Sequence, residues 1–212
     1  MSEQTWGYSN PVGEWAFSVV IPEAERSSAM EAFWSLLRRV TPIVAQRHRL
    51  RSAVISWAEY DAEGNEQQFH ELEDLEGVRW ETLEPRIAEA LASAHLVAVS
   101  SLFLSLDTRI EMPSGDQGWA DDSAELQLSF AAPEWKPSEA AILYSTSIDV
   151  WLATTFDAAM QPRSNAISAA LNLPHLELFL AKLAAQASSS VSIGQSKLYG
   201  TFLIEGGFRS DG

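Results

Sequence analysis

The stretch AEYDAEGNEQQFHELEDLEG, residues 58–77, gathers groups that can do chemistry, because it holds eight carboxylates and no Lys or Arg. Carboxylates at this density can ligate a metal, attract a basic protein or hydrate a loop. Three residues match positions 1, 3 and 5 of a calcium-binding EF-hand loop, namely Asp61, Glu63 and Asn65. The match then ends, because the sixth position needs Gly and is Glu66, and the twelfth needs a bidentate carboxylate and is Leu72. We therefore expect no dedicated calcium site.

The usual signatures of other chemistries are also missing from the sequence. His70 lies beside Glu71 and Glu73, but a solvated histidine next to acids is a simpler interpretation than a metal site. No two histidines have the i, i+4 spacing of a zinc helix, and the chain has no cysteine. Nucleophile elbows, S-x-x-K motifs and glycine-rich phosphate loops are absent. We predict no metal, no cofactor and no assigned catalytic residue, although a pair of distant carboxylates acting as acid and base stays open.

The acidic stretch fits a docking surface better than a metal site. Phe69, Leu72 and Leu75 have a spacing that would fix a short turn or helix to the body of the protein. Like charges this close repel one another, and a basic partner would relieve that repulsion. A hydrated loop without function is the alternative. The acids that would then face outward together are Glu63, Glu66, Glu71, Glu73, Asp74 and Glu76.

A second candidate contact group lies in the segment 112–123, which reads as a loop between two strands. It contains Trp119, Asp121 and Asp122. Trp is a frequent anchor of protein interfaces, so an exposed Trp beside acids suits a docking role. The acids of this region have no known metal-ligand spacing, and a wet hairpin connection is the plainer interpretation.

Composition limits the classes of partner. The 212 residues are 46% apolar and 20% charged, which is typical of a globular chain. A net charge of −15 repels nucleic acid and anionic lipid and speeds the encounter with a basic protein. No 18-residue apolar run predicts a membrane span, and the first residues do not resemble a secretory signal. We expect a cytosolic protein.

The basic residues are unevenly spread. Five arginines and His48 fall within 14 residues, and the arginines are Arg38, Arg39, Arg47, Arg49 and Arg51. They lie near the predicted end of a helix, where cations meet the negative end of the helix dipole. We favour that structural role over the alternative, a phosphate site. The arginines would also make protonation of His48 unfavourable.

Hydrophobic periodicity predicts an α+β fold: a single, mainly antiparallel sheet with helices packed on one face. Alternation predicts strands at 14–22, 51–60, 102–112, 124–130 and 142–156, with a last strand pair at 191–204. Helical spacing predicts a helix that Ser28 and Glu31 begin with a capping box and that Pro42 breaks or kinks. Further helices are expected at 82–94, from Pro162 to Leu171, and from Pro174. One domain, 1–212, with loose ends at 1–13 and 206–212, is the simplest organisation.

Three functions are consistent with these features. The leading hypothesis is a non-catalytic module that binds a basic protein, most concretely an inhibitor or immunity protein that neutralises a basic toxin or effector. The second is an enzyme or small-molecule binder with a polar site over the sheet, lined by Asp107, Arg109, Glu111 and Asp149. The third is a structural subunit of an assembly, which requires an exposed apolar patch.

Overall fold

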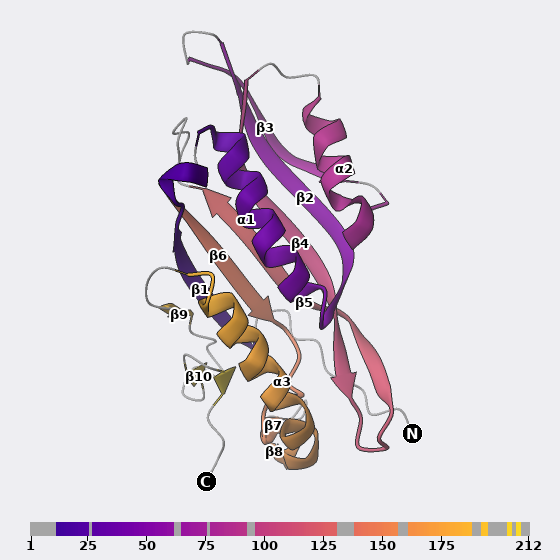
Figure 1. Cartoon of the computed structure of the whole chain (residues 1–212). Helices are drawn as coiled ribbons and strands as arrows, with labels where there is room; N and C mark the ends of the chain where they lie inside the picture. The colour runs from indigo at the N-terminus through magenta and orange to yellow at the C-terminus, as the bar shows by residue number, and fades with distance from the viewer. Residues whose placement is uncertain are drawn as a thin grey trace.

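The computed structural model describes residues 12–25, 27–61, 65–75, 77–92, 96–130, 138–156, 161–187, 192–194, 203–204 and 207–208, a few of them by backbone alone. In this part of the chain, a seven-stranded antiparallel sheet carries three α-helices on one face (Figure 1). The fold is α+β, as the sequence periodicity predicted.

The strand order of the main sheet is β3-β2-β4-β5-β6-β1-β9, so β3 and β9 form its edges. The three central strands follow one another in sequence and space, which confirms the expected meander. Two small two-stranded sheets add β7 (Thr154–Phe156) with β8 (Pro162–Ser164), and β10 (Leu203–Ile204) with β11 (Gly207–Phe208). The strands of the main sheet are β1 (Gly13–Val20), β2 (His48–Tyr60), β3 (Glu66–Leu75), β4 (Val97–Glu111), β5 (Gln117–Phe130), β6 (Glu139–Thr146) and β9 (Ser192–Gly194).

The sheet has one apolar face because its central strands alternate strictly. Leu102, Leu104 and Leu106 of β4 are buried, whereas Phe103 and Ser105 between them are partly exposed. Their cross-strand partners on β5 alternate in the same phase, so the apolar residues of both strands meet on the helical face. Full burial of each such side chain is worth about 1.5–3 kcal/mol, and this face therefore holds the helices in place.

Helix α1 (Ala29–Val44) lies across the middle of the sheet (Figure 1). Its start is as predicted, because the Ser28 hydroxyl accepts a hydrogen bond from the Glu31 N–H at 3.1 Å. The helix does not break at Pro42 but continues to Val44. A proline in the last turn removes only one backbone hydrogen bond, and the buried Val44 keeps the end of the helix against the core.

Helix α2 (Trp80–Leu91) packs beside α1 and against β2 and β3. It begins two residues earlier than expected, and Thr82 stabilises its start from inside the first turn by accepting the Arg79 N–H at 2.9 Å. Arg38 of α1 forms an ion pair with Glu84 of α2, with 3.0 Å between Nη2 and Oε2. The two helices therefore lie side by side on the same face of the sheet.

Helix α3 (Ala166–Ala184) replaces the two helices that were predicted around Pro162 and Pro174. Pro162 belongs to strand β8, and Pro174 lies inside α3. The helix tolerates the internal proline because Leu176, Phe179 and Leu180 are buried on one side and hold it to the core. Consequently His175, which was expected to begin a helix, lies in the middle of one.

Two further expectations about strands are wrong. The predicted strand 142–156 ends at Thr146, and Ile148, Val150 and Leu152 are buried in a turn region instead. Burial of alternate residues in a tight turn imitates the period of a strand, which explains the error. The short turn or helix expected around Phe69, Leu72 and Leu75 is instead the edge strand β3.

Candidate functional site

The described part of the opening acidic stretch is a β-hairpin with an acidic edge strand. β3 is ten residues long and, among the described strands, pairs only with β2. Glu66, Glu71 and Asp74 on β3 are exposed, and no Lys or Arg of the described residues pairs with them. Phe69 on the same strand is 49% exposed. We call Glu66, Phe69, Glu71 and Asp74 the acidic edge.

The three other predicted contact acids of this stretch lie outside what the structure describes. Glu63 and Glu76 are not among the described residues, and Glu73 is described by its backbone only, as part of β3. The acidic edge therefore contains half of the six acids that the sequence proposed as contacts.

Two of the apparent calcium ligands instead hold the hairpin together. The Asp61 carboxylate accepts hydrogen bonds from the Asn65 N–H at 2.8 Å and from the Gln67 side chain at 2.8 Å. An Asp that bonds to backbone a few residues later is a common stabiliser of turns. Asp61 and Asn65 thus have structural partners at the end of β2 and the start of β3.

His70 is integrated into the same hairpin. Its Nε2 lies 2.9 Å from Oε1 of Glu59, and its ring stacks on Trp57 with 4.3 Å between ring centroids and 8° between planes. Trp57 and His70 are direct cross-strand partners on β2 and β3. The sequence suggested Glu71 and Glu73 as the neighbours of His70. In the structure its carboxylate partner is Glu59 on the neighbouring strand.

The second predicted contact group is on a strand and not in a loop. The turn between β4 and β5 takes only residues 112–116. The Met112 N–H donates a hydrogen bond to the Asp116 carbonyl, and Gly115 adopts a positive φ of +88°. Trp119, Asp121 and Asp122 therefore belong to β5. A tight turn with Gly in the left-handed region needs few residues, so the strand begins earlier than the loop-like composition suggested.

Arg49 of β2 organises this second group. Its guanidinium lies 5.1 Å from the centre of the Trp119 ring, which is 45% exposed, and 3.4 Å from the Asp121 carboxylate. Asp122 has φ +48°, at a bulge where its N–H donates to Asp107 at 2.9 Å. Two of the three residues thus already have a cationic partner, and the third shapes the bulge.

Asp107 is the most strongly bonded carboxylate in this region. Its side chain is 5% exposed, and it accepts hydrogen bonds from Arg49 at 2.7 and 2.9 Å, with Arg51 at 3.6 Å. Burial raises its pKa, but the Asp122 N–H and the two arginines outweigh burial and hold the pKa below its ordinary value. Asp107 therefore remains ionised as a structural anchor between β2, β4 and β5.

The polar set proposed for the sheet face is distributed over separate contacts. Asp107 bonds to Arg49, Glu111 lies 3.5 Å from Arg47, and the Asp149 carbonyl accepts a hydrogen bond from Asn165. Neither of the two cavities described below is lined by Asp107, Arg109, Glu111 or Asp149.

The arginine group does not neutralise a helix dipole, contrary to expectation. The last turn of α1 contains no basic residue, because Arg38 and Arg39 lie earlier in the helix and Arg47 follows it. Arg49 and Arg51 point from β2 toward Asp107. Arg49 and Arg51 lie on the same face of the sheet because they are two residues apart on a strand. Their spacing in the sequence gave no sign that Asp107 lies beside them.

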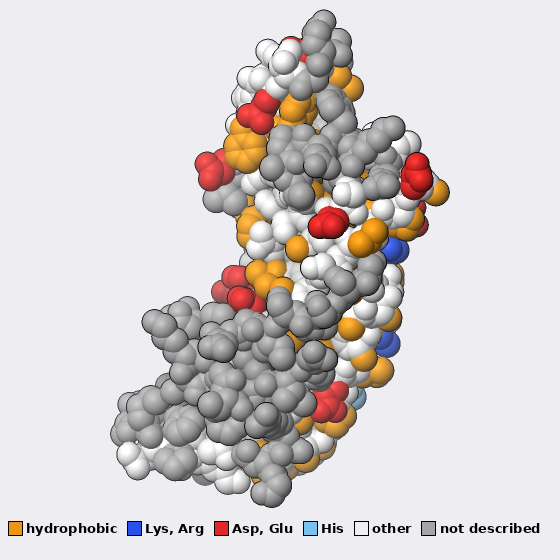
Figure 2. All heavy atoms as spheres, turned by 90° about the vertical axis from the view of Figure 1, so that its left-hand side faces the viewer, with side chains coloured by type: hydrophobic (Ala, Val, Ile, Leu, Met, Phe, Trp, Pro, Cys, Tyr) orange, Lys and Arg blue, Asp and Glu red, His pale blue; other side chains and the backbone are white. Residues whose placement is uncertain are grey.

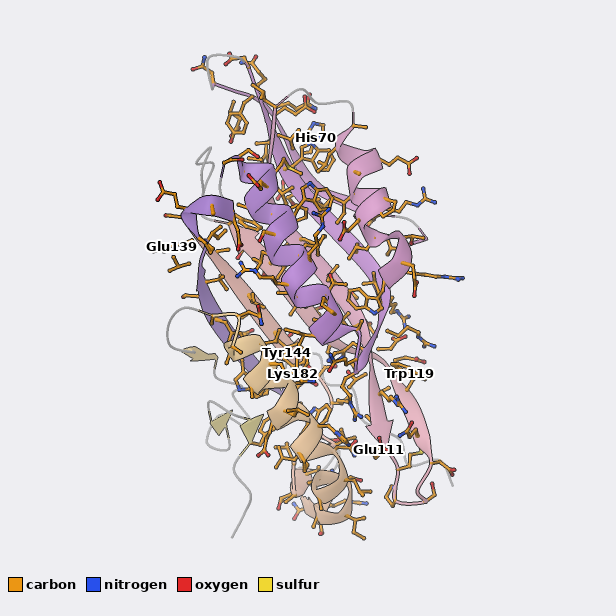
Figure 3. All side chains as sticks on the ribbon, in the orientation of Figure 1. His70, Glu111, Trp119, Glu139, Tyr144 and Lys182 are labelled. Carbon is orange, nitrogen blue, oxygen red and sulfur yellow. The ribbon has the colours of Figure 1, made fainter. Side chains whose placement is uncertain are left out.

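The two candidate contact groups lie far apart. Figure 3 shows His70, which marks the acidic edge, at the top of the molecule and Trp119 at the lower right, near the β4–β5 hairpin. On the face in Figure 2, the described acidic side chains are dispersed, and the Lys, Arg and His side chains appear along the rim that belongs to the helical face. Both contact groups therefore cannot belong to one compact patch.

A buried polar group under α3 was not found from the sequence. His48 is buried between the rings of Tyr144 and Phe179, and its Nδ1 lies 3.2 Å from the Thr108 hydroxyl. Burial, and secondarily Arg47, lowers the pKa of His48 to about 3, so the ring is neutral at physiological pH. The arginine effect that the sequence predicted has the right sign, but burial is the larger cause.

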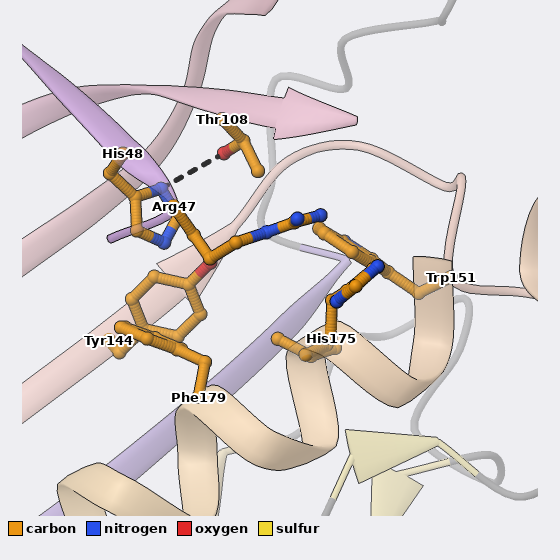
Figure 4. A pocket seen from close by; sticks show the side chains of 8 residues that line it. Arg47, His48, Thr108, Tyr144, Trp151, His175 and Phe179 are labelled. Atoms are coloured by element: carbon orange, nitrogen blue, oxygen red, sulfur yellow. Dashed lines mark hydrogen bonds between the residues drawn. The ribbon is translucent and has the colours of Figure 1, made fainter. Parts of the chain in front are cut away.

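Two hollows that share part of their lining adjoin this group. A cavity of about 10 Å³, close to the size of one water molecule, is lined by residues that include Arg47, His48, Tyr144 and His175 (Figure 4). A cleft of about 190 Å³ opens beside it, between the end of α1 and α3. The two share Arg47, His175 and Phe179 as lining residues, so the cleft lies next to the small cavity that His48 and Tyr144 line. The sequence contains one sign of buried polar contacts under α3. Asn172 is a polar residue at a position that the helical spacing of the apolar residues predicts to be buried.

Comparisons with known proteins identify no relative. No family model, no curated protein and no solved structure matches this chain. Within the described ranges, no three His, Asp or Glu side chains are arranged to hold a metal ion. None of the described helices has the length and apolar character needed to cross a bilayer.

Proposed function

We propose that this chain is a non-catalytic, cytosolic protein-binding module whose acidic edge docks a basic segment of another protein. In its most concrete form, it is an inhibitor or immunity protein that neutralises a basic toxin or effector. The observation that carries the proposal is the edge strand β3, with three exposed carboxylates and a half-exposed Phe69.

The physical features of β3 suit such a partner. An edge strand presents unpaired backbone N–H and C=O groups, to which an extended segment of a partner can add as a further strand. Carboxylates along that strand steer a basic segment and disfavour acidic ones. Phe69 supplies an apolar anchor among the charges, and aromatic anchors dominate the affinity of many interfaces.

The same features have a simpler use, which an experiment must separate from docking. Charged side chains on an edge strand also prevent edge-to-edge aggregation of a protein with itself. If that is their only role, neutralising them changes solubility and leaves partner binding intact.

The test is an affinity capture from native lysate at low and moderate salt, with retained proteins identified by mass spectrometry. It compares the wild type with a variant carrying Glu66→Gln, Glu71→Gln and Asp74→Asn. The matched control removes three exposed charges elsewhere: Glu23→Gln, Glu81→Gln and Glu177→Gln. Both variants have the same net charge, so a difference between them reports position and not total charge.

We expect one basic protein to be retained by the wild type and the control at moderate salt and lost by the β3 variant. Calorimetry with that purified protein should then give an affinity loss of about tenfold or more for the β3 variant, because several interface charges are removed. The wild type should also inhibit the activity of the partner. Equal retention by the β3 variant and the wild type would overturn the proposal.

One observation favours the assembly alternative. Helix α3 exposes Ile167, Leu171 and Leu178, three of the large apolar side chains most open to solvent in the described chain. Their spacing places them along one side of the helix. If they form a subunit interface, analytical ultracentrifugation will detect an oligomer that Leu178→Glu dissociates, whereas the docking proposal requires no oligomer.

A further inference from the structure

The cleft between the end of α1 and α3 has a lining of unusual composition for this protein. Its residues are Ile43, Gln46, Arg47, His175, Leu178, Phe179 and Lys182. The lining contains an arginine, a lysine and a histidine and no carboxylate, although the chain has 29 acidic residues against 14 basic ones. Cationic groups gathered in a concave, partly apolar site are an arrangement that binds anions.

Lys182 is the cation most available to a ligand. It lies in the last turn of α3, and its ammonium group donates to the side-chain oxygen of Gln46, a neutral partner. No described carboxylate forms an ion pair with it. The Lys182–Gln46 contact joins the two walls of the cleft, because Gln46 follows α1 and Lys182 belongs to α3.

Arg47 supplies a second, more buried charge. Its side chain is 18% exposed, and its guanidinium donates to the Arg109 carbonyl at 3.0 Å and lies 3.5 Å from Glu111. Glu111 offsets part of this charge, and it also lies 3.9 Å from His175. Burial of Arg47 strengthens its interaction with any further anion, because solvent screening is reduced there.

His175 is the titratable group beside these charges. Its pKa is lowered by burial first, then by Arg47 and Arg109, while Glu111 acts in the opposite direction. Burial is the largest cause, so the lowered pKa follows mainly from the loss of solvent around the ring, and Arg47 adds to it. A bound anion would add a negative charge beside the ring and raise the pKa.

A buried polar group in the neighbouring small cavity is a second observation. The Tyr144 hydroxyl is fully buried, makes no well-formed hydrogen bond and lines the inner cavity. The Thr146 hydroxyl lies close enough to offset part of the burial that raises the Tyr144 pKa. Figure 4 shows the Tyr144 ring beside His48 and Phe179 among the side chains that line this small cavity. A buried hydroxyl whose hydrogen bonding is incomplete costs stability, and a water molecule or a polar ligand group can satisfy it.

We propose that this cleft binds a small oxyanion, a phosphate or carboxylate group, through Lys182 and Arg47 with His175 beside it. The volume of about 190 Å³ is below the range of about 300–1,000 Å³ for sites of drug-sized ligands, so the occupant is small or is one end of a larger molecule. The site is on the helical face, at a distance from the acidic edge. It does not depend on the proposed function.

The test follows the ring signals of His175 by NMR while inorganic phosphate is added at constant ionic strength, with sodium chloride as the balancing salt. A His175→Gln spectrum assigns the signal among the four histidines. A parallel titration with acetate distinguishes a phosphate from a carboxylate preference. We expect a saturable shift with at least one of the two anions and a higher pKa of His175 in the bound state.

Two variants make the result specific. Lys182→Gln should weaken the affinity for the anion about fivefold, which is the size expected for a partly exposed charge pair. Arg86→Gln removes one charge from the outer side of α2, outside the cleft lining, and should leave the affinity unchanged. A linear, non-saturating response to both anions, or equal effects of the two variants, would overturn the proposal.

Discussion

Single buried residues decide how this protein responds to acid. Among the described residues, no charged side chain pairs with His48, and its neutral ring is packed between two aromatic rings. In the unfolded chain its pKa is about 6.5, whereas in the folded protein it is about 3. Below about pH 6.5, the unfolded chain therefore takes up a proton that the folded protein excludes. The free energy of unfolding consequently decreases as the pH is lowered.

Replacing His48 with Gln should reduce this acid sensitivity. Between about pH 7 and pH 5, the wild type should lose about 2 kcal/mol of unfolding free energy through His48 alone, and His48→Gln should lack that loss. Urea unfolding at both pH values gives, for each protein, the change in the free energy of unfolding between about pH 7 and pH 5. A loss of packing caused by the substitution affects both pH values equally, so it cancels from this change. Identical changes would mean that the His48 ring is protonated inside the folded protein.

At the scale of elements, one polar side chain ties α3 to the end of β4, in addition to the apolar contacts of the helix. Asn172 is fully buried, accepts a hydrogen bond from the Glu111 N–H at 2.8 Å and donates to the Glu111 carbonyl at 2.9 Å. It thereby completes the backbone hydrogen bonds at the end of β4. This contact also places the His175 side of α3 over Arg47, which forms the cleft.

Asn172→Leu should destabilise the protein by about 2–3 kcal/mol, because two backbone groups of Glu111 lose their partner. Leu171→Ala, at the neighbouring and partly exposed position of α3, should cost much less and serves as the control. Chemical denaturation of the three proteins measures both effects. Equal costs for the two variants would show that the hydrogen bonds of Asn172 to Glu111 contribute nothing to stability.

At the scale of the whole molecule, the excess of acidic residues acts on stability. The net charge is −15, and the exposed carboxylates of β3 have no described basic neighbour. Repulsion among them disfavours the compact state, and salt screens that repulsion. Buried or partly buried ion pairs such as Asp107–Arg49 respond much less to salt.

Raising sodium chloride from about 20 mM to about 0.5 M should therefore stabilise the protein by about 1–2 kcal/mol, a rise in Tm of about 3–6 °C. Differential scanning calorimetry measures the shift. The triple β3 variant, which lacks three of the repelling charges, should shift less. A Tm that falls with salt would mean that attraction between opposite charges outweighs the repulsion.

Much of the fold could be predicted because strands and helices have local periods. Leu102, Leu104 and Leu106 alternate as buried residues do on a sheet with one apolar face, and Ser28 marks the start of α1. The errors arose where another signal imitated that period. Ile148 and Val150 alternate within a turn, and Phe69, Leu72 and Leu75 have helical spacing on a strand.

The candidate sites were less predictable because their residues meet across the sheet. Arg49 and Asp107 are 58 positions apart and form a close ion pair only because β2 lies beside β4. The cleft joins the end of α1 with α3, so Gln46 and Lys182 touch although 136 positions separate them. The sequence contained these residue types but no sign of their proximity.

By itself, the sequence determined the α+β class, the meander of the central strands and the strongly acidic character, because each follows from local period or composition. Only the tertiary structure decided that the acidic stretch contains an edge strand, that Trp119 is paired with Arg49, and that a basic cleft exists in an acidic protein. The physical reason is that strand order and helix docking bring distant residues together, and burial then changes the charge and the hydrogen bonding of each of them.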